Sequence, residues 1–395
     1  MGVKIYQLLH TIRALLIVCT VLAGLNLILV LAGSINKNKD IQPLNSEIQP
    51  LVIENIVATT SIATVEPKAT STTITEKPKE VVPPKEEKVV ATIAPKAEPV
   101  VSQAEPVKPK EFLPTEAINI VARDAVVNIL CTSPRSGAFH PISGSGVIID
   151  SRGVILTNAH VAQFFLLNEE TDCVIRTGSP AKNKYHAELL FLPPAWIEAN
   201  AKSITEQSPF GTGENDYALL RITESVVNTA PLPEVFTHLP VGPKDTIDST
   251  NRMLVVAYPS ELIGAIATQL NLFQVSTTAE VTRAFYFGDD QDSPAIDLIS
   301  IGGSIVAQGG SSGGAIIDLE DGKVLGIIVT STRGETTEKK DLRGVTLSHI
   351  NRSIQNYTQL SLSDFISQDL ETLGRWFNQN LFAKLRASLT GALGI

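Results

Sequence analysis

From about Phe112 onward, the sequence consists of short apolar runs rich in β-branched residues, separated by Gly, Ser and Asp. Runs of this length and composition favour strands, and many short strands with few helical patterns are typical of an all-β sandwich or barrel. The runs cover residues 125–130, 146–150, 154–157, 173–175, 187–191, 217–220, 253–256, 315–318 and 324–329. Asp321-Gly322, between the last two runs, is a strong hairpin signal. The sequence therefore predicts an all-β domain over residues 112–360.

A long apolar segment precedes this domain, within residues 1–33. Ala14–Gly33 has no charged residue, and twenty helical residues rise about 30 Å, the thickness of the hydrocarbon core of a bilayer. A cleaved signal peptide is the alternative, because Lys4 and Arg13 precede the segment and small residues follow it. Secretory apolar regions run only about 7–15 residues, which favours a retained transmembrane helix. Basic residues lie on both sides, so charge does not fix its orientation.

Residues 34–111 differ from both neighbours in composition. They contain no aromatic residue and no glycine, while prolines recur among Lys, Glu, Thr, Val and Ala. Such a stretch cannot bury enough apolar surface to offset the entropy lost on ordering it. Frequent prolines favour extended polyproline II conformations, and mixed charge keeps the chain solvated. We expect a disordered, semi-rigid stalk; a docking motif within it is the alternative.

The charged residues and the cysteines exclude several kinds of partner. Lys and Arg number 32 against 41 Asp and Glu, a formal net charge of −9, whereas nucleic-acid-binding domains concentrate basic residues. Three cysteines are too few for a disulfide scaffold, and no CxxC pair indicates zinc. His186, His238 and His349 show no metal-ligand spacing. We therefore expect no nucleic acid, no metal and no cofactor.

After Ser361 the apolar residues recur every three or four positions, which predicts an amphipathic helix over residues 361–395. The apolar stripe consists of Ile366, Leu370, Leu373, Phe377, Leu381, Leu385 and Leu389, with Trp376 and Phe382 beside it. Two interpretations stay open. The helix covers the barrel, or it binds a membrane surface or a partner.

Three short segments bring chemistry-bearing residues next to predicted strands. VILTNAHV puts His160 at the end of one strand, NDYALLRI puts Asp216 at the start of another, and QGGSSGGA puts Ser312 in a glycine-rich turn before a third. Each segment alone is compatible with a purely structural role. Their joint occurrence in the order His, Asp, Ser is much more specific.

TNAH, NDYALL and GSSGGA resemble the three triad segments of the trypsin-like serine peptidases of the chymotrypsin superfamily. GSGVIIDSRGVILTNAHV is especially similar to the bacterial Deg/HtrA-type branch. The resemblance covers about Ala117 to Asn356. It implies two six-stranded antiparallel β-barrels of the chymotrypsin type with the catalytic cleft between them. The first barrel would supply His160 and Asp216, and the second would supply Ser312.

The chemistry of such a site explains why these residue types occur together. A serine hydroxyl is a poor nucleophile at neutral pH, so a neutral imidazole must accept its proton. The resemblance gives this role to His160, while Asp216 would hold the ring in one tautomer and Ser312 would attack the substrate carbonyl. The backbone N–H groups of Gly310 and Ser312 would form the oxyanion hole, where one donor is worth roughly 3–4 kcal/mol.

A rival motif uses the same turn. GGSSG fits the GxSxG nucleophile elbow of α/β-hydrolases, and Asp341 and His349 could complete its order of Ser, acid and His. That elbow must lead from a strand into a helix. The residues that follow, AIIDLEDGKVLGIIV, instead predict a β-hairpin. We therefore disfavour the elbow.

The chain departs from the family in two respects. Ser311 stands where trypsin has an acid that pairs with a newly cut N-terminus, and no activation sequence is evident near Phe112. A trypsin-style zymogen switch is therefore not expected. Deg-type proteins usually carry PDZ domains after the protease, whereas only about forty residues follow Asn356. Regulation through a PDZ domain is not expected either.

The resemblance also bears on the cysteines. In the family's barrel the first and fourth strands are neighbours, and Cys131 and Cys173 lie at the ends of what the sequence predicts as those strands. A disulfide between them would close a loop of about 40 residues in an oxidising compartment. Two buried thiols are the alternative, and Cys19 lies in the predicted membrane span.

The residue six before the nucleophile largely sets the base of the S1 pocket in this superfamily, and here it is Val306. The opposite wall would come from Thr330, Ser331 and Thr332, with Gly344 leaving room behind it. In such an uncharged slot a substrate Lys or Arg would be desolvated without a partner. We expect cleavage after small or medium aliphatic residues, with shallow discrimination.

These expectations describe a membrane-anchored serine endopeptidase that acts on polypeptides. It would cross the cell membrane once, with the protease domain on the extracytoplasmic side, and serve protein quality control or processing there. A homo-oligomer is compatible with this organisation. The alternative is a catalytically inactive, protease-like module that binds peptides or partners on a membrane stalk.

Overall fold

The structure, a computed structural model, describes residues 114–395 apart from 134–140, 206–211, 228, 248–250, 262–263, 288–294, 303–305 and 332–340. The predicted transmembrane helix and stalk lie outside the described residues and stay predictions. Within the described part of the chain, no helix is both long enough and apolar enough to cross a bilayer.

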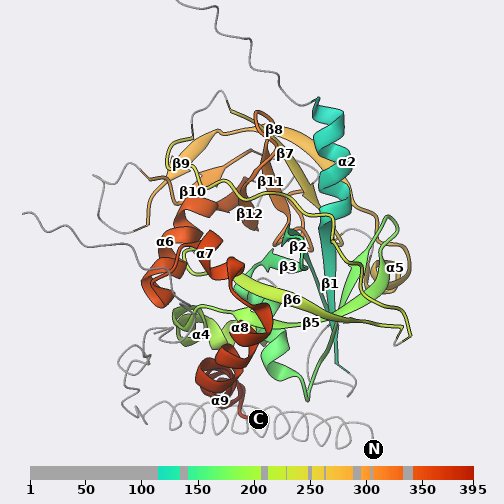
Figure 1. The fold of residues 1–395 in the computed structure, drawn as a ribbon, viewed down its shortest axis with the longest axis vertical. Coiled ribbons are helices and arrows are strands. Elements are labelled where there is room, and N and C mark those ends of the chain that lie inside the picture. Colours follow the sequence, from blue (N-terminus) through green and yellow to red (C-terminus); the bar gives the residue numbers. More distant parts are fainter. Residues whose placement is uncertain are drawn as a thin grey trace, which may run out of the picture. The chain divides into compact units, whose positions relative to one another are not determined.

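The first half of the described chain forms a closed barrel of six antiparallel strands, in the order β1-β2-β3-β6-β5-β4 (Figure 1). The strands are β1 (Val126–Thr132), β2 (Ile142–Asp150), β3 (Val154–Thr157), β4 (Asp172–Thr177), β5 (Lys182–Phe191) and β6 (Ala218–Ser225). The helical segments around them are α2 (Thr115–Ala125), α3 (Ala159–Ala162), η2 (Gln163–Leu167), α4 (Pro194–Asn200) and η3 (Ala201–Thr205). Closure pairs every strand on both sides and leaves no exposed edge. The expected first barrel is confirmed.

The second half forms a seven-stranded antiparallel sheet in the order β8-β7-β11-β12-β13-β10-β9. Its strands are β7 (Arg252–Ala257), β8 (Val275–Glu280), β9 (Arg283–Phe285), β10 (Leu298–Ser300), β11 (Ala315–Asp318), β12 (Val324–Ser331) and β13 (Leu342–Thr346), and α5 (Gly264–Asn271) follows β7. The expectation of a second closed six-stranded barrel therefore needs correction. The edge strands β8 and β9 follow each other in the chain with only Val281 and Thr282 between them. β8 pairs with β7, and β9 pairs with β10. The strand therefore breaks at Val281 and Thr282, where the chain changes from one pairing partner to the other.

Strand β7 shows how the apolar interior is divided. Successive side chains of a strand point to opposite faces. Met253 and Val255 pack with Ile299 in a core belonging to the second sheet, whereas Leu254 and Val256 join a larger core that also contains first-barrel residues. The two halves are therefore packed together through the outer face of β7.

The chain ends in a succession of helical segments rather than in one helix. They are α6 (Leu347–Thr358), α7 (Leu362–Ser367), α8 (Leu370–Phe377), the π-helical turn η5 (Asn378–Phe382) and α9 (Ala383–Leu393). The predicted apolar stripe is buried along its whole length, from Ile366 at 6% exposed to Leu389 at 0%.

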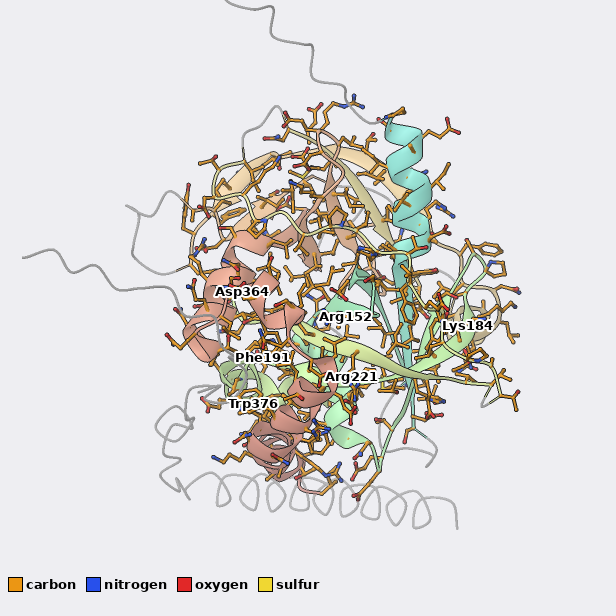
Figure 2. All side chains as sticks on the ribbon, viewed as in Figure 1. Arg152, Lys184, Phe191, Arg221, Asp364 and Trp376 are labelled. Carbon is orange, nitrogen blue, oxygen red and sulfur yellow. A yellow bond between two sulfur atoms is a disulfide. The ribbon has the colours of Figure 1, made fainter. Side chains whose placement is uncertain are left out.

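Two arginines, one in the first barrel and one on α9, tie this stretch to the barrel. Arg152, in the β2–β3 turn and labelled in Figure 2, donates to the carbonyl of Gln368 at 3.0 Å. Arg386 on α9 donates to the carbonyl of Leu166 at 2.8 Å and pairs with Glu170 at 2.9 Å. The C-terminal segments therefore cover the barrel, which is the first of the two interpretations of the stripe.

Candidate active site

His160 lies on α3, directly after β3, and faces the residue that opens β6. Its Nδ1 lies 2.7 Å from Oδ2 of Asp216, and its backbone N–H donates to Oδ1 of the same carboxylate at 2.9 Å. Because an ionised carboxylate only accepts, this contact assigns the ring proton to Nδ1 and leaves Nε2 as the nitrogen able to accept one. The pair has the geometry of a general base with its orienting acid.

The main chain around Asp216 is held from both halves of the molecule. Asn158, the residue before α3, donates its side-chain amide to the carbonyl of Asp216 at 2.8 Å. On the other side, Gly213 adopts φ +88°, and a Cβ there would stand 3.1 Å from Cγ2 of Val329 on β12. The turn that carries Asp216 therefore rests against the second sheet.

Ser312 lies in the turn before β11, and this turn is pressed against the first barrel. The carbonyl of Ser312 accepts from the N–H of Ser145 at 2.7 Å. Gly313 adopts φ +83°, and a Cβ there would lie 2.0 Å from the carbonyl oxygen of Ser145 and 2.5 Å from Oγ1 of Thr157. Only glycine fits such an approach. Thr157 ends the strand that leads to His160, so the turn meets that strand end.

The fold thus brings the three segments of the sequence motif together from two different sheets. Two of the three residues, His160 and Asp216, are joined by hydrogen bonds. Among the described residues, Ser312 Oγ forms no hydrogen bond with His160, a contact that is often long in proteases without bound substrate.

Ser145 on β2 contacts the predicted site and was not singled out by the sequence analysis. Besides its N–H bond to Ser312, its hydroxyl donates to the carbonyl of Gly310 at 2.8 Å and accepts from the N–H of Tyr258 at 3.0 Å. Ser145 is 0% exposed. It ties the first barrel to both predicted oxyanion-hole residues. The signal available in the sequence was a serine between two glycines inside a predicted strand.

The backbone of the predicted oxyanion hole has an open conformation. Gly310 adopts φ +92°, and the N–H of Ser311 closes the turn on the carbonyl of Gln308 at 3.2 Å. Neither the N–H of Gly310 nor that of Ser312 donates to another group among the described residues. Within the described part of the chain, no group competes with a substrate oxygen for either donor.

A neighbouring segment after β7 fixes the peptide plane of this turn. The carbonyl of Gly309 accepts from the N–H groups of Ser260 at 2.8 Å and Glu261 at 3.1 Å, and Oε2 of Glu261 accepts from the N–H of Gly309 at 2.9 Å. In a trans peptide the N–H points away from the C=O. Holding the Gly309 carbonyl therefore turns the Gly310 N–H away from the Ser260–Glu261 segment.

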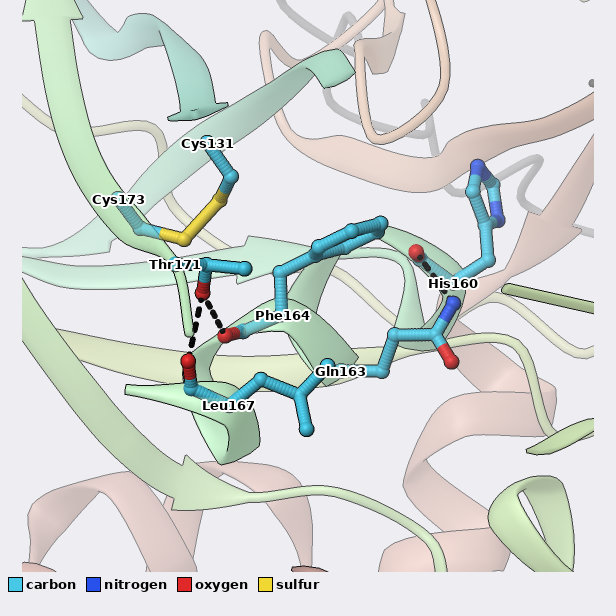
Figure 3. Close-up of a disulfide and its surroundings, with 7 residues drawn as sticks. All are labelled: Cys131, His160, Gln163, Phe164, Leu167, Thr171 and Cys173. Carbon is cyan, nitrogen blue, oxygen red and sulfur yellow. Dashed lines mark hydrogen bonds between the residues drawn. A yellow bond between two sulfur atoms is a disulfide. The ribbon is translucent and has the colours of Figure 1, made fainter. Parts of the chain in front are cut away.

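Cys131 and Cys173 face each other across β1 and β4 and are joined by a disulfide (Figure 3). Close to the bridge, Thr171 donates its hydroxyl to the carbonyl of Leu167 at 2.9 Å. Leu167 ends η2, which continues α3 and therefore carries His160 on the same helical segment. The disulfide thus lies near the C-terminal end of the helical segment that carries His160, the predicted general base.

The predicted S1 residues are only partly described. Val306 is 0% exposed and packs in the core of the second sheet. Thr330 and Ser331 end β12 with side chains outside the described part, and Thr332 lies outside it. A Cβ at Gly344 would meet Cδ1 of Ile316 at 2.1 Å. Ile316 thus packs closely against Gly344, and the S1 role of this glycine stays a prediction.

The structure disagrees with the hydrolase elbow. The glycine-rich turn leads into strand β11 and not into a helix. His349 lies on α6, where it pairs with Asp297 at 2.9 Å, a contact that the sequence analysis did not foresee. Within the described residues, no group of three or more His, Cys, Asp or Glu side chains is arranged to hold a metal ion.

Comparison with known proteins finds one matching family model. The model of the trypsin-like peptidase domain matches residues 144–327, a range that contains His160, Asp216 and Ser312. Among solved structures, the chain is similar to an HtrA-type protease, AlgW with a decapeptide, at 16% identity and a TM-score of 0.40, over 62% of this chain and 67% of that chain. None of the curated proteins searched matches the chain. Residues 144–327 are therefore similar to the trypsin-like peptidase domain.

Proposed function

We propose that this chain is a serine endopeptidase that hydrolyses peptide bonds through Ser312, His160 and Asp216. The observation that carries the proposal is the close packing of the Gly313 turn against the end of β3, three residues before His160. The 2.7 Å contact between His160 and Asp216 supports it further.

In the proposed reaction, Ser312 Oγ attacks the carbonyl carbon of the substrate while Nε2 of His160 accepts the hydroxyl proton. Asp216 stabilises the imidazolium that forms. The imidazolium then protonates the leaving amine as the C–N bond breaks, which leaves an acyl group on Ser312. Water attacks this ester by the same route and restores the enzyme.

Charge develops on the substrate oxygen at both tetrahedral stages. The N–H groups of Gly310 and Ser312 would stabilise it, because they have no other partner among the described residues. Such donors act most strongly when they are fixed before the reaction. The hydrogen bonds from Ser260, Glu261 and Ser145 to this turn supply that fixation.

The proposed substrates are polypeptides, cut after small or medium aliphatic residues. Val306, buried in the core of the second sheet, gives the S1 base an apolar character. Sequencing the products from an unfolded protein tests this. Predominant cleavage after Lys, Arg, Asp or Glu would show that Val306 does not set the pocket.

We further propose that the chain crosses the cell membrane once through residues 14–33, with a stalk over 34–111 and the peptidase on the extracytoplasmic side. Quality control or processing of proteins would be its task there. The Deg/HtrA-like sequence GSGVIIDSRGVILTNAHV and the uncharged segment Ala14–Gly33 support this proposal. The disulfide agrees with an oxidising compartment.

A second candidate is a protease-like module that binds peptides without cutting them. The observation in its favour is that Ser312 Oγ and His160 form no hydrogen bond among the described residues. The two candidates differ in the reactivity of Ser312, since only an activated serine attacks a fluorophosphonate.

The deciding experiment treats the purified full chain with a fluorophosphonate probe. We expect one modified residue, Ser312, and no labelling of the Ser312→Ala variant. Ser311→Ala is the matched control, because its buried hydroxyl has no partner in the described part of the chain. It should label like wild type. Absence of labelling in the folded wild-type chain would favour the binding module.

A further inference from the structure

His349, in the first turn of α6, touches a hydrogen-bond acceptor with each ring nitrogen. Nδ1 lies 2.9 Å from Oδ1 of Asp297, and Nε2 lies 2.6 Å from the carbonyl oxygen of Glu214. A carbonyl oxygen can only accept, and so can an ionised carboxylate. Both contacts are therefore hydrogen bonds at the same time only when both nitrogens carry a proton. The geometry describes an imidazolium.

Asp297 is held in its ionised form. Burial opposes its ionisation, but the hydrogen bonds from His349 and from the N–H of Phe287, together with the charge of Arg352, outweigh burial and lower the pKa of Asp297. The Phe287 N–H donates to Oδ2 at 2.7 Å. A protonated Asp297, which would satisfy a neutral His349 by donating, is therefore disfavoured.

The second acceptor connects His349 to the predicted triad. Glu214 lies two residues before Asp216, in the turn that opens β6. A second contact flanks Asp216 on its other side, where the hydroxyl of Tyr217 bonds to Oγ of Ser353 at 2.8 Å. Ser353 follows His349 by four residues and so shares its face of α6. One face of α6 holds the chain immediately before and after Asp216.

We propose that protonated His349 is a positioning residue for Asp216, and that activity falls when it loses this proton. The inference rests on the proposed peptidase function. Asp297 carries a charge and is the stronger acceptor. The remaining proton of a neutral ring therefore stays on Nδ1. Nε2 then turns a lone pair toward the Glu214 carbonyl, and an attraction that held the Asp216 turn becomes a repulsion.

Some charged groups around His349 stabilise its protonated ring, and others destabilise it. Asp297 favours the imidazolium, whereas Arg352 opposes it from the same helix. The N–H groups at the start of α6 oppose a cation as well. Asp245, from the segment before β7, lies 3.6 Å from Arg352 and partly offsets that charge. Across the contact, Glu214 has an exposed side chain.

Histidine is the side chain that ordinarily changes charge between about pH 5 and 8. The rate of Ser312 labelling in the wild-type full chain should first rise with pH, since the proposed reaction needs a neutral imidazole. It should then fall about 5-fold as the bond to Glu214 is lost, the effect of one positioning hydrogen bond.

In His349→Gln, the amide can donate to Glu214 but cannot titrate. The fall of the labelling rate at higher pH should therefore disappear, while its rise at lower pH should stay. His186→Gln is the matched control. His186 lies opposite Glu224, at the end of β6 distant from Asp216, and its variant should keep both limbs. An unchanged alkaline fall in His349→Gln would overturn the inference.

A second measurement separates this inference from the peptidase proposal. Nitrogen NMR of the full-length Ser312→Ala chain, uniformly labelled with nitrogen-15, needs no activity, and the His349→Gln spectrum assigns the ring signal. We expect both ring nitrogens of His349 to be protonated at low pH. The Asp216 and Tyr217 amides should shift with the same midpoint as the ring. A His349 ring that is neutral at every pH would overturn the inference even where Ser312 labels normally.

Discussion

The two halves of the described chain supply the predicted triad in different ways. The first barrel is closed, bridged by a disulfide and covered by the C-terminal helices, and it joins His160 to Asp216 by direct hydrogen bonds. The second sheet has short three-residue strands at one side and presents Ser312 on a turn between strands, with glycines at positive φ on both sides.

This difference indicates where the precision of the site originates. The predicted base and its predicted acid are fixed inside one closed sheet. The predicted nucleophile is fixed by contacts across the boundary, chiefly Ser145 with the Ser312 turn and Gly313 against Thr157. Changes within the first barrel should therefore act on acid–base chemistry or global stability, and changes at the boundary should act on the oxyanion hole.

The largest effect in this comparison should come from Asp216→Asn. An asparagine amide donates toward Nδ1 and favours the wrong tautomer of His160, a change that lowers kcat by about 10⁴-fold in a triad protease. Steady-state hydrolysis of a peptide substrate by the full chain measures it. Asp172→Asn, at an exposed position of β4, should leave kcat unchanged. A loss below tenfold in Asp216→Asn would remove Asp216 from the mechanism.

The disulfide should matter for stability and much less for chemistry. Replacing Cys131 and Cys173 by alanine opens a loop of 42 residues, which costs about 4 kcal/mol of unfolding free energy in the chain-entropy model. Denaturant unfolding of the full chain measures this, and reduction of the wild-type chain should reproduce most of it. At low temperature the folded double variant should still label at Ser312. An unchanged unfolding midpoint would mean that the bridge does not form.

The smallest effect should come from Glu261, which follows β7 and contacts the Ser312 turn within the second half. In Glu261→Ala the Gly309 N–H loses its acceptor, so the Gly310 N–H is less well fixed. Because an oxyanion donor lost outright costs about 10²–10³-fold in kcat, we expect a loss of about tenfold with little change in KM.

Glu261→Gln is the matched variant for this prediction, since its amide oxygen can still accept from Gly309. It should recover most of the rate. Equal losses in the alanine and glutamine variants would show that the charge of Glu261, and not its hydrogen bond, is what the site uses.

Local patterns made the fold class and the three site segments predictable. Each of the segments TNAH, NDYALL and GSSGGA is a short continuous stretch of sequence, so each could be found without knowing the fold. The β-branched runs mark the strands in the same local way. The broken strand at Val281 and Thr282 was not predictable, because it depends on which strand pairs with which. A propensity pattern does not contain that choice.

The supporting residues were hidden for a related reason. Ser145 lies 165 residues from Gly310, and His349 lies 135 residues from Glu214, so no local spacing connects either pair. The close approach of Ile316 to Gly344 was hidden in the same way, because Ile316 belongs to another strand. Contacts between distant segments were the part that only the structure could supply.

The most direct test of the account is the rate at which a fluorophosphonate modifies Ser312 in the full chain and in its His160→Ala variant. The account predicts modification at Ser312 in the wild-type chain and a rate lower by at least about 10³-fold in His160→Ala, because the base from one sheet activates the nucleophile on the other. Equal rates in the two proteins, or modification of a different serine, would contradict it.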